Sequence, residues 1–363
     1  MKKSFLFIAM ATVAVAGCLK SETVVIETPQ ELTFGAMSNV ATKTNEVTTA
    51  YLPGDYRIYA SATQKSANGQ VYKPNYFTDQ PFDTDAEGAA LETAVYHAWD
   101  AEADQAAPIY WPLGGYSLDY IAYAMPVAVH DADPALAEGP VATYENETNM
   151  DLGVASLVAF NGWDTYKNQV DLLWAYKNDA TTATSAEKVE LEFAHAQALL
   201  EFNAKVNLPN VLQIQKITIN GLLVKGNFIV DNTKNTVKAS WDGLEAVGEE
   251  NVIAPGATTT NDNLHIYNKD EDPTDVGSEY LDNTTEYELV GSRLLIPEQK
   301  ACNIVVTYVI SGNQMTYEYN NTRTMWEMGK KYIYNLDFVL NEVAIAPTVK
   351  VFEDVVEPVP SLE

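Results

Sequence analysis

The sequence predicts an all-β protein with two β-sandwich domains in tandem. Apolar and polar residues alternate with a period of two in many short runs, as in Tyr332–Leu340, and this is typical of strands with one buried face. Turn signals such as Asn220-Gly221 separate these runs. No long helix is indicated, and the length of 363 residues suggests about two domains.

The composition excludes several classes of function. The chain has 50 acidic and 22 basic residues, for a net charge of −28, so its surface repels nucleic acids and anionic membranes. Its four histidines are scattered, and it lacks the serine-hydrolase, zinc-protease, C-x-x-C and phosphate-loop motifs. We therefore expect neither an enzyme nor a bound cofactor or metal, and no nucleic-acid partner.

Residues 1–17 have the features of a lipoprotein signal peptide. Lys2 and Lys3 precede an apolar stretch, Phe5–Ala16, that is too short to span a bilayer. The small residues before Cys18 resemble a bacterial lipobox, which implies cleavage before Cys18 and attachment of lipid to it. We expect a protein that is exported and tethered to the outer membrane; an ordinary secretory signal is the alternative.

The first domain is predicted to span residues 18–180. It begins with a strand over 23–34, followed by a small, polar loop over 35–50 whose only basic residue is Lys43. An exposed lysine in such a loop is a good target for a basic-specific protease. Residues 64–109 fit either a short helix or an irregular segment, and 130–155 are typical of a loop. Four apolar residues of the first strand share even numbers, as expected for one face: Val24, Ile26, Leu32 and Phe34.

A polar linker over 178–185 is predicted to separate the two domains, and the second is placed at 186–340. It begins with Val189, Leu191 and Phe193, which occupy odd positions. The next apolar run, Leu200 to Val206, occupies even positions. A bulge or turn must lie between the runs, because a one-residue shift turns every side chain to the opposite face.

The C-terminal tail, residues 341–363, is a candidate strand with no later strand in the chain to pair with. An unpaired strand is an aggregation hazard unless another chain takes it up. Six of its branched apolar residues share odd numbers: Val343, Ile345, Val349, Val351, Val355 and Val359.

Two possible binding features have ordinary structural explanations. Asp83–Glu87 resembles the start of a calcium loop, but Ala94 stands where the loop needs a bidentate glutamate. His195 adjoins a buried-strand pattern and is expected to be a core histidine. Six tryptophans could stack on sugars, although packing in the core or at its edge is the simpler interpretation: Trp99, Trp111, Trp163, Trp174, Trp241 and Trp326.

Four segments, in this order, resemble the fimbrillin family of Bacteroidales, the type V pilins and related Mfa-like surface lipoproteins. They cover most of the chain after Cys18, and the order and spacing are more specific than any single segment. The segments are Tyr110-Trp111-Pro112 with Leu118–Ala124; Asp171–Ala175; Val189–Ala196; and Trp326–Tyr334.

The resemblance implies two transthyretin-like Greek-key sandwiches and a role as a subunit of an adhesive cell-surface fimbria. It also implies assembly by donor-strand exchange, in which a surface protease cuts at Lys43 and frees the first strand. The C-terminal tail of another copy, or of another pilin subunit, then fills the groove. A lipid-anchored surface glycan-binding protein is the alternative function.

Overall fold

The computed structural model describes the chain from residue 29 to residue 351 with several gaps. Within it the all-β class is confirmed, since no α-helix occurs in the described residues. Nor does this part of the chain contain a helix with the length and hydropathy needed to cross a membrane. Residues 1–17, Cys18, Val24, Ile26, Lys43 and Val355 lie outside the described residues. The described residues are 29–38, 52–87, 91, 93–130, 141–145, 154–161, 170–185, 187–207, 212–220, 225–231, 238–245, 263–268, 286–297, 303–320, 325–339 and 342–351.

The N-terminal strands form one sheet that closes on itself. Their order is β1-β10-β9-β6-β2-β3-β4-β5, and β1 also pairs with β4, so β1 completes a ring. We call this sheet the N-terminal ring. It encloses a core rich in aromatic residues, including Phe34, Phe82 and Tyr120. The strands are β1 (Thr33–Ser38), β2 (Tyr56–Lys65), β3 (Val71–Asp83), β4 (Tyr96–Asp100), β5 (Gln105–Ala106), β6 (Ser117–Pro126), β9 (Leu173–Ala180) and β10 (Val189–His195).

A second sheet, the junction sheet, combines strands from both halves of the sequence in the order β14-β13-β8-β7. Phe228, Val230 and Trp241 of this sheet share an apolar cluster with Tyr59 and Tyr123 of the N-terminal ring. The junction sheet is therefore packed against the ring. Its strands are β7 (Val141–Glu145), β8 (Val154–Asn161), β13 (Lys225–Asp231) and β14 (Lys238–Glu245).

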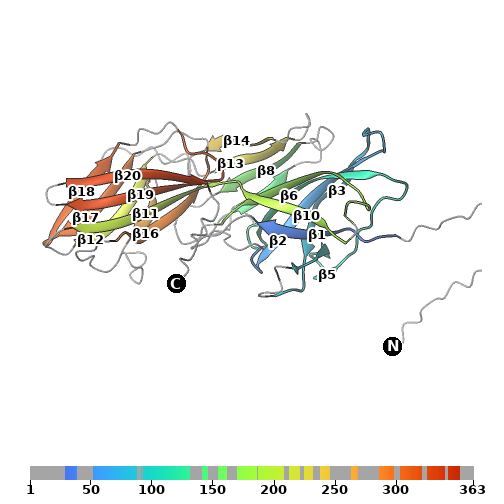
Figure 1. Cartoon of the computed structure of the whole chain (residues 1–363), viewed down its shortest axis with the longest axis horizontal. Helices are drawn as coiled ribbons and strands as arrows, with labels where there is room; N and C mark the ends of the chain where they lie inside the picture. The colour runs from blue at the N-terminus through green and yellow to red at the C-terminus, as the bar shows by residue number, and fades with distance from the viewer. Residues whose placement is uncertain are drawn as a thin grey trace, which may run out of the picture.

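The remaining strands form a β-sandwich of two four-stranded sheets, ordered β16-β11-β19-β20 and β15-β12-β17-β18. Alternating residues of both sheets share one core, as their period-2 patterns predict. This C-terminal sandwich and the N-terminal ring lie at opposite ends of an elongated molecule (Figure 1). The strands are β11 (Ala198–Asn207), β12 (Leu212–Asn220), β15 (Asn263–Asn268), β16 (Glu288–Leu295), β17 (Ile304–Ile310), β18 (Asn313–Tyr319), β19 (Lys330–Val339) and β20 (Glu342–Val351).

The sheet boundaries differ from the expected domain boundaries. β10 was expected to begin the second domain at 186–340, but it pairs with β1 and β9 of the N-terminal ring. β9 runs on to Ala180, through residues expected to be linker, because its second half still pairs with β6. β1 extends to Ser38, beyond the expected strand end at residue 34. The expected loop over 130–155 contains β7 and the start of β8.

The change of phase between the two apolar runs is confirmed. A bend at Ala196 and Gln197 separates β10, which belongs to the ring, from β11, which belongs to the sandwich. Both backbone carbonyls at the bend accept hydrogen bonds: Trp241 Nε1 donates to Ala196 O at 2.6 Å, and Gly329 N donates to Gln197 O at 2.9 Å. The chain thus passes from one core to the next at a fixed, hydrogen-bonded corner.

Part of the tail, residues 342–351, forms the strand β20, and this strand has a partner within the chain. β20 pairs antiparallel with β19 along its whole length, from Glu342 opposite Val339 to Val351 opposite Lys330. β20 is the edge strand of its sheet. Its other long side therefore carries no strand among the described residues.

Candidate functional site

The strand β1 is held in the ring by two unequal ladders. It pairs in parallel with β10 over five residues, Phe34 to Ser38, and antiparallel with β4 over two, Thr33 and Phe34. Just before β1, Leu32 N donates to Ile109 O at 2.8 Å, and Trp111 N donates to Gln30 O at 2.9 Å. We call the space that β1 fills, between β10 on one side and β4 with residues 109–111 on the other, the β1 slot.

Apolar side chains anchor β1 in the slot. Leu32 and Phe34 are fully buried and Ala36 is nearly so, at 7% exposure, as their even spacing in a strand requires. The Phe34 ring lies edge-on to Phe82 and Tyr120, with centroid distances of 4.5 and 5.2 Å. Burial of a large apolar side chain stabilises by about 1.5–3 kcal/mol, so Leu32 and Phe34 make a substantial contribution to the attachment.

Few side-chain polar contacts hold β1 among the residues whose side chains are described. Thr33 Oγ1 donates to Glu187 O at 3.0 Å. Glu31 Oε1, one residue before Leu32, lies 2.8 Å from His97 Nδ1, and both of these side chains are more than a third exposed. An exposed pair of this kind contributes about 1 kcal/mol or less. The strand is therefore held by backbone pairing and apolar burial, and both can be reproduced by another strand with suitable side chains.

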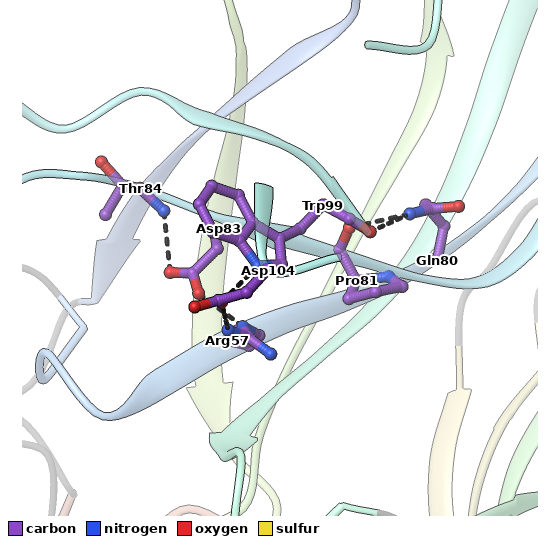
Figure 2. A network of polar contacts seen from close by, with 7 residues as sticks. All are labelled: Arg57, Gln80, Pro81, Asp83, Thr84, Trp99 and Asp104. Carbon is purple, nitrogen blue, oxygen red and sulfur yellow. Dashed lines mark hydrogen bonds and ion pairs between the residues drawn. The ribbon is translucent and has the colours of Figure 1, made fainter. Parts of the chain in front are cut away.

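A separate network fixes β4, one wall of the slot, to β2 and β3. Arg57 of β2 forms an ion pair with Asp83 of β3 and lies 5.8 Å from the ring centroid of Trp99 on β4. Trp99 Nε1 donates to Asp104 Oδ1 at 3.3 Å, and Gln80 Nε2 donates to Trp99 O at 2.9 Å. Figure 2 shows these residues gathered at one place. The network contains no residue of β1, so these contacts do not depend on a side chain of that strand.

The same network explains the calcium-like motif. The Asp83 carboxylate accepts hydrogen bonds from Arg57 and from the backbone N–H of Thr84, the latter at 2.8 Å (Figure 2). Asp83 is thus engaged by a guanidinium group. No group of three or more His, Cys, Asp or Glu side chains suited to a metal occurs among the residues with described positions.

The core behind β1 is kept uncharged. Burial raises the pKa of Tyr120 and of Tyr56 well above the usual value. The pKa of Tyr96, whose backbone pairs with Phe34, is raised to about 12 by burial and by the nearby Asp83 carboxylate. All three hydroxyls therefore remain protonated at neutral pH, and the slot is lined by neutral aromatic rings.

The tryptophans mostly serve packing, as the simpler interpretation predicts. Trp111, Trp241 and Trp326 are buried, while Trp99 and Trp174 are half-buried. Trp326 Nε1 donates to the Tyr334 hydroxyl at 3.0 Å, which fixes one of the motif residues inside the sandwich. Trp163 lies outside the described residues.

His195 is the buried core histidine that its strand pattern predicts. Its Nδ1 lies 2.6 Å from Asp171 Oδ2, and both side chains are almost completely shielded from solvent. The partner was not predicted, because Asp171 reaches His195 only through the pairing of β9 with β10.

The structure brings some of the predicted site residues together and separates others. Leu32 and Phe34 lie in or beside β1, at one end of the molecule, whereas Val343 to Val351 lie in β20 of the C-terminal sandwich (Figure 1). Sequence reasoning missed Ala36 and the walls of the slot. The even spacing of Leu32, Phe34 and Ala36 was an available signal for extending the strand.

Comparison with known proteins places this arrangement in a family. The sequence profile described as fimbrillin-like matches residues 47–351, most of the chain. The chain belongs to the fimbrillin-like family. No protein of curated function matches it by sequence.

Solved structures support the fold of this fimbrillin-like chain. A fimbrial protein from Bacteroides vulgatus is similar with a TM-score of 0.53 and 14% identity, over 89% of this chain and 100% of that one. A candidate cell adhesion protein from Bacteroides ovatus gives a TM-score of 0.50 and 16% identity, over 90% and 98% of the two chains. At such identities the likeness shows the fold alone.

Proposed function

We propose that this fimbrillin-like protein is a structural subunit of a cell-surface fimbria that serves adhesion, and that it assembles by donor-strand exchange. The observation that carries the proposal is β1, a short strand that alone closes the N-terminal ring between β10 and β4. Family membership and the fold shared with a fimbrial protein support the fimbrial role.

Processing at Lys43 would convert β1 from a covalent part of the domain into a bound peptide. Lys43 follows β1 in the sequence, so a cut there separates β1 from β2 and from the rest of the ring. If β1 then leaves, the aromatic core beneath Phe34 is exposed to water. Such exposed apolar surface and unpaired backbone favour the entry of another strand.

The donor is proposed to come from the C-terminal tail of a neighbouring subunit. In this chain β20 occupies a sheet edge, so it can separate from β19 without interrupting the pairing of β19 with β11. Each backbone hydrogen bond regained in the slot contributes about 0.5–1.5 kcal/mol, in addition to apolar burial. Before processing, lipid on Cys18 would hold the subunit at the outer membrane.

Replacement of the proposed cleavage residue tests this function. Cells expressing Lys43→Ala should display subunits that retain residues 18–43 and form no polymer, as measured by mass spectrometry of the displayed subunit and electron microscopy. Lys238→Ala, which removes an exposed lysine on β14, is the matched control and should be processed and polymerise normally. Normal polymers from the Lys43→Ala subunit would contradict protease-triggered assembly.

A glycan-binding role has less support. Each tryptophan within the described ranges is buried or half-buried, so the tryptophans offer little exposed surface for stacking on a sugar. The exposed aromatic side chains in these ranges include the tyrosines Tyr72, Tyr110, Tyr176 and Tyr287.

A further inference from the structure

We propose that the β1 slot selects a donor strand by an aromatic residue at its centre, and that the preferred donor comes from a different pilin subunit, not from another copy of this chain. This inference rests on the proposed strand exchange and specifies the partner. It follows from the shape of the space that Phe34 now fills and from the residues available in the C-terminal tail.

The space around Phe34 is built from aromatic rings. Phe82 and Tyr120 present edges or faces to it at 4.5 and 5.2 Å, with interplanar angles of 70° and 88°. These two rings are themselves backed by Phe77, at 5.8 and 6.2 Å, and Tyr120 is also contacted by Trp111 at 6.5 Å. Interlocked rings of this kind cannot close easily around a smaller side chain, because interiors are densely packed and relax only partially.

The backbone neighbours complete the enclosure. Phe34 lies opposite Val189 of β10 on one side and opposite Tyr96 of β4 on the other, and all three side chains are buried. Two residues away on either side, the slot holds Leu32 and Ala36, which are also buried. A strand that refills the slot therefore needs large aliphatic, aromatic and small residues at successive inward positions.

The tail of this chain does not provide that order. Its odd-numbered apolar residues are valine and isoleucine, which leave part of the space of a phenylalanine ring empty. The only aromatic residue in 341–363 is Phe352, and it is flanked two positions away by Lys350 and Asp354. If Phe352 entered the central space, these charged residues would take the buried positions of Leu32 and Ala36, where an unpaired charge is strongly disfavoured. Neither phase of the tail matches the slot.

A strand-replacement assay tests the inference. The full mature chain, with a specific protease site in place of residues 41–46, is cleaved so that β1 becomes a bound fragment. Synthetic peptides then compete for the slot, and native mass spectrometry measures the fraction of subunits in which the original fragment has been displaced. The peptides are an isotope-labelled copy of residues 29–40, the same peptide with Phe34→Val, the tail peptide 341–355, and that tail peptide with Ile345→Phe.

We expect the labelled 29–40 peptide to compete at least tenfold more effectively than its Phe34→Val version and than the tail peptide. The Ile345→Phe change should improve the tail peptide. Equal competition by the 29–40 peptide and its Phe34→Val version would overturn the aromatic requirement, and a tail peptide as effective as 29–40 would overturn the preference for a different subunit. If not even the labelled 29–40 peptide enters, the slot does not exchange strands. That result would contradict both the proposed assembly by strand exchange and the proposed choice of donor subunit.

Discussion

Phe34 is the residue on which the packing of β1 most depends. It is fully buried, contacts two core rings and lies between two strands that otherwise have no pairing with each other among the described residues. Its even-numbered position beside Leu32 was enough to predict an inward-facing side chain. Its contacts with Phe82 and Tyr120 were not predictable, because they depend on strands far away in the sequence.

Truncation of this side chain should weaken the N-terminal ring. We expect Phe34→Ala to lower the free energy of unfolding by about 3–5 kcal/mol, since it removes a buried ring and leaves a cavity. Urea unfolding of the intact chain measures the change. Tyr72→Ala, at a side chain that is 65% exposed on β3, is the control and should change stability by about 0.5 kcal/mol or less. Equal effects of the two substitutions would show that Phe34 does not anchor β1.

Tyr96 gives a pH-dependent prediction. Its hydroxyl is buried without a hydrogen-bond partner among the described residues, so Tyr96→Phe should be neutral or slightly stabilising at pH 7. Because the pKa is about 12 in the folded protein and 10 for an unperturbed tyrosine, the stability contributed by the neutral hydroxyl is present below pH 10 and is lost as the pH rises toward 12. The difference reaches about 1.4 kcal/mol per pH unit in that window.

Urea unfolding at neutral pH and near the top of that window checks this expectation. Tyr96→Phe should retain more stability than the wild type in alkali. If both proteins lose stability equally, Tyr96 ionises in the folded state as easily as in the unfolded state.

At the scale of elements, the sequence predicted strands best where alternation and turn chemistry agreed. Ser311-Gly312 forms the turn between β17 and β18, and both residues have positive φ, of 50° and 78°, as a tight two-residue hairpin requires. β3 was missed because most of its residues are half-buried or exposed without alternation. β7 was missed because it lies in an acidic segment with a loop-like composition.

The Arg57 network should decide how firmly β4 is held. Arg57→Met keeps the aliphatic stem but leaves the half-buried Asp83 without its cation, so we expect a loss of about 1–3 kcal/mol. Amide hydrogen exchange should accelerate in β4 and leave β19 unchanged. Lys205→Met removes a more exposed ion pair, with Asp337 at 3.5 Å, and is expected to cost about 1 kcal/mol or less. Unchanged exchange in β4 would exclude a clamping role for the network.

At the scale of the whole molecule, the fold is defined by pairings across long sequence separations. β1 and β10 form a parallel pair, and Thr33 contacts Glu187 across 154 residues. Parallel pairing of this kind leaves no turn signal in the sequence, so the closure of the ring was not predictable from local patterns. The same closure moved β10 out of its expected domain and placed β1 between β10 and β4.

A reversible covalent lock on β1 tests this account most directly. Gly35 and Glu190 are paired across β1 and β10, and a side chain added at Gly35 would meet the Glu190 side chain, so cysteines at both positions can form a disulfide. Cys302, the one cysteine of the sequence besides Cys18, is replaced by serine in a chain that carries Gly35→Cys and Glu190→Cys. Polymer formation after cleavage, in the presence of the other pilin subunits, is followed by electron microscopy with and without reductant. We expect polymers only under reducing conditions, because the oxidised subunit cannot release β1. Equal polymerisation of the oxidised and reduced subunits would contradict strand exchange at the β1 slot.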